Sequence, residues 1–261
     1  MNFKTEFELP DGNFRDVFSD HKVVHVKSNE NDMDLTGNLF KKLASEVGIP
    51  LVYEEDPISG QIDLTRWTEI KYKPETSHDS YKHSNHFQPL HTDYCYFSFE
   101  IYASFFYCVE QAGFGGATTF INVDQVVEIL GSENNSLLDR LQNQQISFGR
   151  KNNPIAQNTD YILKKDEKGW QINWNYYRAQ NDVENKPLID EFRDFLDTSI
   201  EKSGELLEIK LQPGEGVFFH DRKVLHGRNS FLGNRQLNKG GIAVNLPEYV
   251  QEILKISGGV Y

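Results

Sequence analysis

GVFFHDRKVLHGR, residues 216–228, indicates the fold more strongly than any other stretch of this chain. Two short apolar runs flank the polar pair Asp221-Arg222, and the turn residues Pro213-Gly214 stand just before the first run. Apolar and aromatic runs separated by turn residues are typical of neighbouring strands. We therefore predict a strand, a tight turn and a second short strand in this stretch.

The segments outward from this stretch divide into strand-like and helix-like types. Aromatic, β-branched or alternating apolar residues predict strands in three segments: Tyr94–Val109, Leu206–Leu211 and Gly240–Leu246. Apolar residues at helical spacing predict helices in three others: residues 34–47, 124–142 and 187–202. We expect the second helical segment to be two short helices broken near Gly131. Strands dominate the middle and the last third, which favours a mostly β fold with helical decoration around a double-stranded β-helix (jelly-roll) core.

The chain has 261 residues, of which 38% are hydrophobic, enough for one large core. We expect a single domain over residues 1–261, because β-rich folds of this length often form one. Within it we expect an N-terminal part over about 1–75, a jelly-roll core over about 76–250 and an insertion over about 150–205. The charged stretch Lys164–Gly169 is interpreted as a hairpin turn.

Charge and apolar content exclude several classes of function. Asp and Glu total 39 against 27 Lys and Arg, a net charge of −12, and such a surface repels nucleic acid. No apolar run reaches the roughly 20 residues of a membrane-spanning helix, and the first residues do not resemble a signal peptide. We expect a cytoplasmic protein with a small-molecule partner. Cys95 and Cys108 are expected to be buried, reduced thiols. The oligomeric state is open.

Three residues form a candidate metal site. His91-Thr92-Asp93 is the chain's one H-x-[DE] triplet, and on an extended segment its first and third side chains share a face. His226, at the end of the predicted second strand, is the best third ligand. Two histidines and one carboxylate form a facial triad, which suits Fe(II) and O₂ chemistry. Of the remaining histidines, His220 is expected at the rim of the site and His83 and His86 in a loop beside it.

Four motifs, in this order, resemble the TauD/TfdA branch of the Fe(II)/2-oxoglutarate dioxygenases, which includes taurine dioxygenase and γ-butyrobetaine hydroxylase. They are Leu90-His91-Thr92-Asp93, Gly115-Gly116-Ala117-Thr118, Val224-Leu225-His226-Gly227-Arg228 and Asn234-Arg235-Gln236-Leu237. The first 60 residues match this family only in general character.

The resemblance implies that His91, Asp93 and His226 bind Fe(II), with 2-oxoglutarate and O₂ as cosubstrates. It also implies that Thr118 and Arg235 hold the C5 carboxylate of 2-oxoglutarate, for which arginine supplies a two-pronged donor. Thr119 stands next to Thr118, so the register of the strand is open by one residue. Arg228, two residues after His226, is the alternative anchor. The expected reaction decarboxylates 2-oxoglutarate to succinate and oxidises, most simply hydroxylates, a small molecule. The carboxylate Asp93 argues against halogenation, for which related enzymes have a small residue there.

The substrate site is expected between the polar loop Ser80–Phe87 and the aromatic segment Trp170–Arg178. Phe87 and Tyr94 are candidate walls, and Arg178 is a candidate partner for an anionic group. We hypothesise a free amino acid or a related metabolite as substrate. Two alternatives are a Zn²⁺-dependent hydrolase with the same three ligands and a non-catalytic jelly-roll binding protein. Neither needs the cosubstrate residues Thr118 and Arg235.

Overall fold

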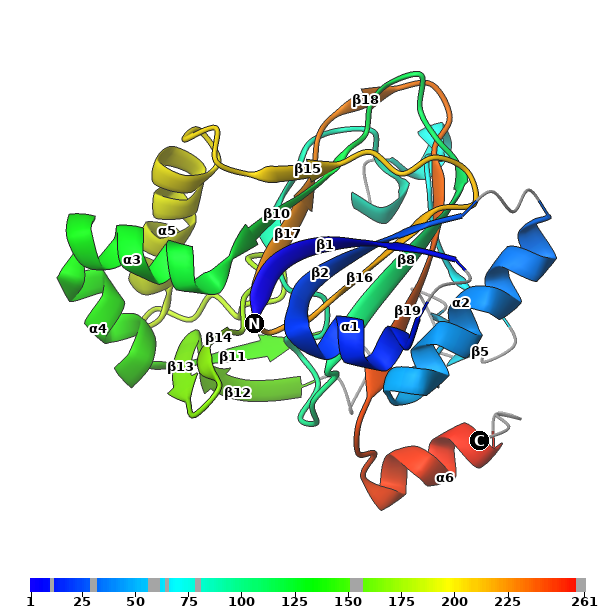
Figure 1. Cartoon of the computed structure of the whole chain (residues 1–261). Helices are drawn as coiled ribbons and strands as arrows, with labels where there is room; N and C mark the ends of the chain where they lie inside the picture. The colour runs from blue at the N-terminus through cyan, green and yellow to red at the C-terminus, as the bar shows by residue number, and fades with distance from the viewer. Residues whose placement is uncertain are drawn as a thin grey trace.

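Two facing β-sheets form the centre of the molecule (Figure 1). The computed structural model describes residues 1–9, 12–28, 32–55, 62–63, 66–77, 81–150 and 157–256. In order across the larger sheet lie β1 (Asn2–Glu8), β2 (His21–Lys27), β16 (Gly216–Phe219), β8 (Ala103–Glu110), β19 (Gln236–Ala243) and β3 (Ile49–Leu51), with β6 (Thr68–Lys71) also paired to β19. Across the smaller sheet lie β15 (Leu207–Ile209), β10 (Thr118–Asn122), β17 (Val224–Arg228) and β7 (Gln88–His91).

The space between the sheets is filled by apolar side chains from both of them. Phe106 and Phe219 come from the larger sheet and Phe120 from the smaller one, and all three are buried in one cluster. The rings of Phe120 and Phe219 meet edge to face, with centroids 5.2 Å apart. Such aromatic burial is a large part of what holds two sheets together. The predicted mostly β fold with a jelly-roll core is confirmed.

The strand–turn–strand prediction for residues 216–228 is also confirmed, and the turn has a particular consequence. β16 pairs with β2 and β8 in the larger sheet, whereas β17 pairs with β10 and β7 in the smaller one. The turn between them is closed by a hydrogen bond from Lys223 N to His220 O, 3.0 Å long. The consecutive strands β16 and β17 therefore belong to opposite sheets.

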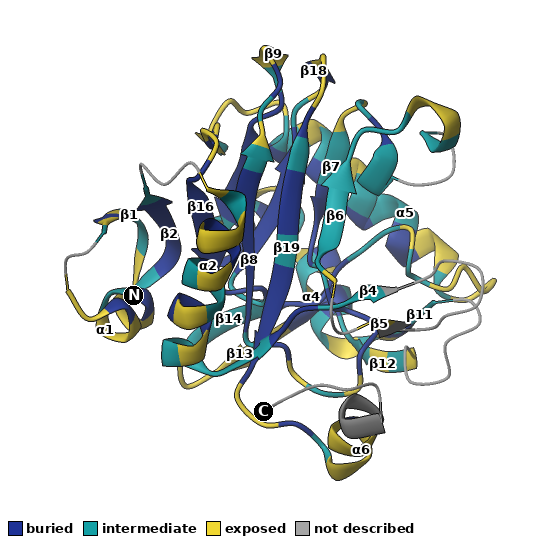
Figure 2. Cartoon of the chain, turned by 90° about the vertical axis from the view of Figure 1, so that its right-hand side faces the viewer, coloured by how far each residue is buried: buried dark blue, intermediate teal, exposed yellow. Residues whose placement is uncertain are grey.

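Two helices cover the outer face of the larger sheet. They are α1 (Phe14–Asp20) and α2 (Met33–Val47), and α2 confirms the helix predicted over 34–47. Asp32 begins α2 by accepting hydrogen bonds from the backbone N–H groups of its first turn. Phe40 of α2 is fully buried and stacks on Phe218 of β16. Figure 2 shows α2 lying along the sheet with its outer side exposed.

The remaining elements lie mostly beside the sheets. The helices are α3 (Val123–Glu133), α4 (Asn135–Asn143), α5 (Lys186–Phe195), a π-helical turn (Leu196–Ile200), α6 (Glu248–Ile256) and two 3₁₀ turns (Pro74–Thr76 and Tyr81–His83). Paired short strands are β11 (Gln145–Gly149) with β12 (Gln157–Tyr161), β13 (Leu163–Asp166) with β14 (Gly169–Ile172), β9 (Phe114–Gly115) with β18 (Phe231–Leu232), and β4 (Glu54–Glu55) with β5 (Ile62–Asp63). None of the described helices is long and apolar enough to cross a membrane.

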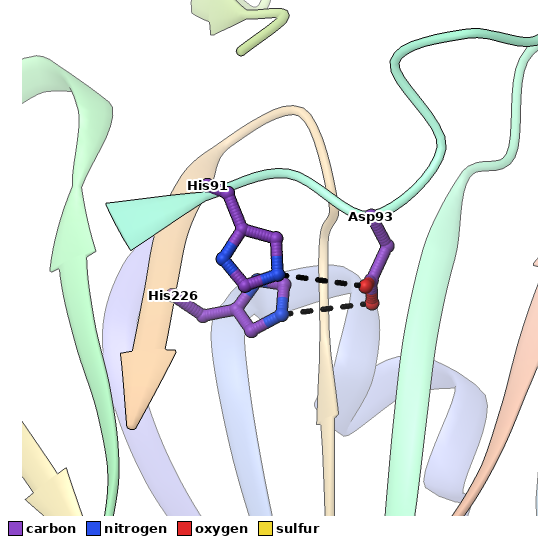
Figure 3. Close-up of side chains that lie close together, drawn as sticks. All are labelled: His91, Asp93 and His226. Atoms are coloured by element: carbon purple, nitrogen blue, oxygen red, sulfur yellow. Dashed lines mark ion pairs between the residues drawn. The ribbon is translucent and has the colours of Figure 1, made fainter. Parts of the chain in front are cut away.

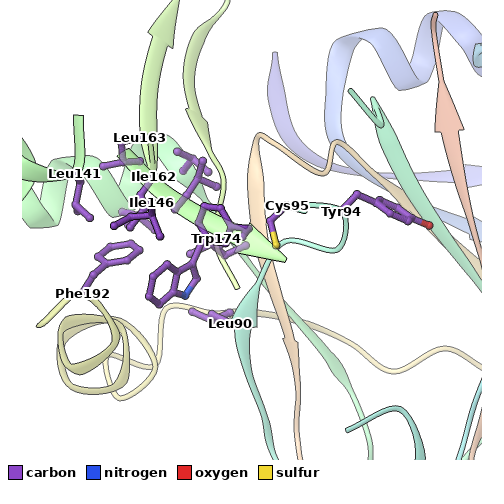
Figure 4. Close-up of a cluster of buried hydrophobic side chains, with 14 of the residues drawn as sticks. Leu90, Tyr94, Cys95, Leu141, Ile146, Ile162, Leu163, Trp174 and Phe192 are labelled. Atoms are coloured by element: carbon purple, nitrogen blue, oxygen red, sulfur yellow. The ribbon is translucent and has the colours of Figure 1, made fainter. Parts of the chain in front are cut away.

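A second apolar core joins these lateral elements to the jelly roll (Figure 4). Its centre is Trp174, which is fully buried and meets Phe192 of α5 edge to face at 4.7 Å. The same cluster contains Leu90 and Cys95, which stand on either side of the His91–Asp93 triplet. The lateral core therefore packs directly against the segment that carries the candidate metal ligands.

Four predicted boundaries were wrong. The strand predicted over Leu206–Leu211 is shorter and spans Leu207–Ile209. In the segment predicted over Tyr94–Val109 the strand begins only at Ala103 and ends at Glu110, because residues 94–97 form a turn in which Phe97 N donates to Tyr94 O. The last strand, β19, ends at Ala243, before the predicted Leu246. The break between α3 and α4 lies at Asn134 and not near Gly131. The Asn134 N–H closes α3, while its side-chain oxygen accepts from Leu137 N to begin α4.

Other local predictions hold. The helix expected over 187–202 is α5 with its π-helical turn. The charged stretch 164–169 forms the end of the β13–β14 hairpin, with Lys164–Asp166 on β13 and the turn closed where Asp166 pairs with Gly169. Cys95 and Cys108 are both buried and free, and burial raises the pKa of the Cys108 thiol to about 12.

Candidate active site

The three predicted metal ligands meet at the junction of β7 and β17 (Figure 3). His91 is the last residue of β7 and is the direct cross-strand partner of His226 in β17, and Asp93 follows two residues later. Ligand atoms of the three side chains all lie within 4.8 Å of one another. The Nε2 atoms of His91 and His226 lie 3.9 and 3.6 Å from the two carboxylate oxygens of Asp93.

Both imidazoles are held in the uncharged state that a metal ligand requires. Burial lowers the pKa of His226 to about 3 and also lowers the pKa of His91. The Nδ1 atom of His91 lies 2.8 Å from the carbonyl oxygen of Pro89. Donation of the Nδ1 proton to that carbonyl leaves the Nε2 lone pair of His91 facing Asp93.

Asp93 is a buried carboxylate kept ionised by a lysine. Burial alone would raise its pKa, but the charge of Lys239, with smaller contributions from the two histidines, brings the pKa well below its ordinary range. The Lys239 Nζ atom lies 2.5 Å from Asp93 Oδ1. The other oxygen, Oδ2, is buried and accepts no hydrogen bond from any residue in the described part of the chain. An unsatisfied carboxylate oxygen that faces two neutral imidazoles fits a divalent cation.

A second carboxylate holds the backbone of the metal segment. Asp221, in the turn after β16, accepts hydrogen bonds from Asp93 N at 3.0 Å and Tyr94 N at 3.4 Å. Ser104 on β8 adds a hydroxyl 3.4 Å from Asp221 Oδ1. Burial, and next the nearby charge of Asp93, raises the pKa of Asp221 to about 6. The turn that carries the chain between the two sheets thus also positions Asp93.

Arg235 is a buried cation beside the glycine motif. It is 3% exposed, and its Nε donates to the carbonyl oxygen of Gly116 over 3.0 Å. A Cβ atom on Gly116, whose φ is +77°, would lie 3.1 Å from Arg235 Cδ, so glycine permits this close packing. Arg235 forms no ion pair with any described residue. Burial lowers its pKa to about 9, and an anionic ligand is the natural complement of such a group.

The register of β10 decides between Thr118 and its neighbour Thr119. Thr118 lies opposite Arg228 on β17, and Phe120 lies opposite His226. Because alternate residues of a strand share a face, Thr118 is on the face of His226, between the sheets. Thr119 is opposite Gly227, on the other face. Thr118 is therefore the threonine on the inner side.

Arg228 has a different set of partners. Its Nη2 atom donates to the carbonyl oxygens of Ser84 at 2.7 Å and His86 at 2.8 Å, and Nη1 donates to Tyr81 O at 3.3 Å. The guanidinium therefore ties the loop of residues 81–86 to the wall of the jelly roll. This loop, with Phe87, is the described part of the predicted polar wall Ser80–Phe87, of which Ser80 lies outside the described residues.

A pocket of about 810 Å³ opens onto His91 and Asp93. The three residues predicted to contact substrate, Phe87, Tyr94 and Arg178, all line it. In the segment Trp170–Arg178, only residues 175–178 reach the pocket, because Trp174 is turned into the lateral core. A volume of several hundred cubic ångströms is the usual size of a small-molecule site.

The other histidines are placed as follows. His86 lines the pocket, and the His83 Nδ1 atom lies 3.0 Å from the Thr76 hydroxyl. The prediction that His220 lies at the rim was wrong. It is 2% exposed, and its ring stacks on Phe18 of α1 at 4.2 Å, because the chain just after β16 passes beneath the helix that covers the outer face of the larger sheet.

Two residues of this site, Lys239 and Asp221, were not found by sequence reasoning. A signal for Lys239 was present, since it stands four residues after Arg235 in a strand-like stretch and so projects to the same side. Asp221 carried no comparable signal, because its role depends on how the turn after β16 meets the metal segment.

Comparisons with known proteins agree with this geometry. No curated protein matches the sequence. Solved structures with the same fold include asparagine oxygenase in complex with Fe(II), 2S,3S-3-hydroxyasparagine and succinate (TM-score 0.68, 13% identity, 88% of this chain and 76% of that chain). Others are the non-heme iron oxygenase OrfP with Fe and alpha-ketoglutaric acid (0.64, 12%, 88% and 77%) and a taurine dioxygenase from Burkholderia xenovorans (0.62, 14%, 95% and 88%).

The family model described as taurine catabolism dioxygenase TauD, TfdA family, matches residues 7–240. That range includes His91, Asp93, His226 and Arg235, and it extends the sequence resemblance back into the N-terminal strands. The chain therefore belongs to the TauD/TfdA family and is an Fe(II)/2-oxoglutarate-dependent dioxygenase.

Proposed function

We propose that His91, Asp93 and His226 bind Fe(II), and that Arg235 and Thr118 hold the C5 carboxylate of 2-oxoglutarate. The enzyme then converts 2-oxoglutarate, O₂ and a small molecule to succinate, CO₂ and the hydroxylated product. The observation that carries this proposal is the pairing of a three-ligand cluster with a buried arginine that has no acidic partner among the described residues. Neither a zinc hydrolase nor a binding protein requires that arginine, and the family comparison supports neither alternative.

The donor set fits iron. His91, Asp93 and His226 would hold the ion, and two imidazoles with one carboxylate are the donor set that suits Fe(II) sites with positions left open for cosubstrates. Bound Fe(II) supplies the activation of O₂. The chain's own residues keep the imidazoles neutral, hold the Asp93 carboxylate ionised and enclose the site. Lys239 and Asp221 act as positioning residues in this scheme, since one contacts the carboxylate of Asp93 and the other its backbone N–H.

Arg235 is favoured over Arg228 as the cosubstrate anchor because their donors differ in availability. Both Nη atoms of Arg228 already donate to carbonyl oxygens of the 81–86 loop. Arg235 uses Nε for Gly116, and no described residue accepts from its Nη groups. The free side of a guanidinium is the one that receives a carboxylate through two parallel hydrogen bonds. Thr118, the first residue of β10, adds a hydroxyl as a further hydrogen-bond donor to the same carboxylate.

The substrate we propose is a free amino acid or a related carboxylic acid metabolite. Its walls would be Phe87, Tyr94 and Arg178, which line the pocket together with His91 and Asp93. Crystals of asparagine oxygenase, which has the same fold, contain a hydroxylated amino acid. The volume of the pocket suits a molecule of that size and not a polymer.

Anaerobic titration of the protein with Fe(II) and 2-oxoglutarate tests the central claim. A weak visible charge-transfer band should form only when both are present, and air should then yield succinate. His91→Ala and Asp93→Ala should abolish the band and the succinate. His21→Ala is the matched control, because that histidine lies at the start of β2 and its ring nitrogen contacts Val17 O. Bound iron without the band in the wild type would contradict the proposal.

A further inference from the structure

Two arginines meet in the pocket at the end of β11. Phe148 and Ala179 form an isolated antiparallel bridge, and Gly149 N donates to Arg178 O over 2.9 Å. This bridge brings Arg150, which follows β11, beside Arg178. Their guanidinium carbons lie 5.9 and 5.8 Å from the centre of the Tyr96 ring. Both arginines and Tyr96 line the pocket that contains His91 and Asp93.

Basic side chains outnumber acidic ones in the described lining of this pocket. Its described lining contains four basic side chains, Lys82, Arg150, Arg178 and Lys239, but only two acidic ones, Glu54 and Asp93. Lys82 pairs with Glu54 and Lys239 with Asp93. Arg178 is half-buried and forms no ion pair with any residue that the structure describes. Among the described lining residues, basic side chains therefore outnumber acidic ones in a chain whose net charge is −12, and an excess of basic side chains attracts anions.

The proposed cosubstrate anchor does not account for this charge. Arg235 is not among the pocket-lining residues and packs instead against Gly116, on the β9–β10 side. Arg178 belongs to the lateral segment and contacts Tyr96, only three residues beyond Asp93. The Cα atoms of Tyr96 and Asp93 are at most about 11 Å apart, since an extended chain spans at most about 3.6 Å per residue. An anion at Arg178 would thus lie about the length of a small molecule from the metal ligands.

We propose that the substrate is net anionic, with a carboxylate that Arg178 receives beside Arg150 on the Tyr96 ring. This rests on the proposed function and narrows its substrate class. A free α-ammonium group would find a poor match here, because Glu54 and Asp93, the acidic side chains of the described lining, are already engaged by lysines. The site favours an N-blocked or acidic amino acid, or a simple carboxylic acid, over a neutral zwitterion.

The test uses sets of three probes that share a side chain and differ in charge: an amino acid, its N-acetyl derivative and its amide. Each is added anaerobically to the enzyme with Fe(II) and 2-oxoglutarate, and the shift of the charge-transfer band gives its Kd. We expect the N-acetyl acids to bind most tightly and the amides least. Arg178→Gln should weaken binding of the anionic probes by about 10- to 100-fold, as expected for one lost charge-assisted contact, and Arg178→Lys by less. Arg140→Gln, an identical charge change on α4 outside the pocket, should have no effect.

The outcomes separate the two proposals. If the band does not form in the wild type, the proposed function fails. If the band forms but no anionic probe shifts it, or amino acids and amides bind as tightly as the N-acetyl acids, only the anionic-substrate proposal is overturned. It is also overturned if Arg178→Gln weakens 2-oxoglutarate binding more than twofold, because the arginine would then serve the cosubstrate. Unchanged melting temperatures for the Arg178 variants establish that they are folded.

Discussion

Replacing Arg235 by methionine should abolish cosubstrate binding while making the ligand-free protein more stable. Burial lowers the pKa of Arg235 from 12.5 to about 9. This shift corresponds to a free-energy cost of roughly 5 kcal/mol for keeping the guanidinium charged in the folded protein. Methionine has a similar length and no charge. It loses the hydrogen bond to Gly116, worth about 1 kcal/mol, and some packing. We expect a net gain of the order of 2 kcal/mol in the free energy of unfolding near neutral pH, where the arginine is charged.

The same substitution should weaken 2-oxoglutarate binding by at least about 100-fold, since two charge-assisted hydrogen bonds are lost. Urea unfolding of the ligand-free protein and anaerobic titration of the charge-transfer band measure the two effects. Arg228→Met is the matched control. Burial also lowers the pKa of Arg228, to about 10, but its donors hold three loop carbonyls, so this variant should be less stable than the wild type. The reasoning is refuted if Arg235→Met is destabilised as much as Arg228→Met and still binds 2-oxoglutarate normally.

Three further predictions concern the surroundings of the site. Thr118→Val should weaken 2-oxoglutarate binding about fivefold, the value of one neutral hydrogen bond, whereas Thr119→Val should leave it unchanged; titration of the band compares them. Lys239→Met should destabilise the metal-free protein by about 3 kcal/mol, because the buried Asp93 carboxylate loses its partner, and added Mn(II) should raise the melting temperature more in this variant than in the wild type. Glu201 accepts a hydrogen bond from the N–H of Leu90, next to His91, and burial raises the pKa of its carboxyl from 4.5 to about 7. Its contribution to stability is therefore present at low pH and is lost as pH rises from about 5 to 8. Glu201→Gln should remove that part of the pH dependence in thermal melts, and an unchanged profile would contradict the assignment.

The parts of the site that could be predicted from sequence are those whose geometry is local. His91 and Asp93 are two residues apart on an extended segment, so their shared face follows from strand geometry. The position of Thr118 follows in the same way once its strand is known, but the sequence left Thr118 and Thr119 open. Only the pairing of β10 with β17 distinguishes them, because it aligns Phe120 with His226.

The parts that could not be predicted depend on contacts between distant segments. Arg228 resembled an anion anchor because it shares a face with His226, yet its guanidinium is engaged by carbonyl groups more than 140 positions earlier in the chain. Arg150 had no motif around it, and its place beside Arg178 depends on the bridge between Phe148 and Ala179. His220 was misplaced for the same reason, since nothing near it in sequence indicates that α1 covers it.

The pairing of β10 with β17 joins the metal site to the cosubstrate site. His226 and Arg228 are alternate residues of β17, and Phe120 and Thr118 are their partners on β10. A slip of one residue in this pairing would turn each inner side chain to the outer face. Only glycine fits at position 227, between the two inward-facing residues, because a Cβ atom there would lie 2.6 Å from the Gln88 carbonyl oxygen on β7. Gly227→Ala should therefore force β7 and β17 apart and weaken Fe(II) and 2-oxoglutarate binding together, although the residue touches neither. Loss of one affinity without the other would show that the two sites are positioned independently.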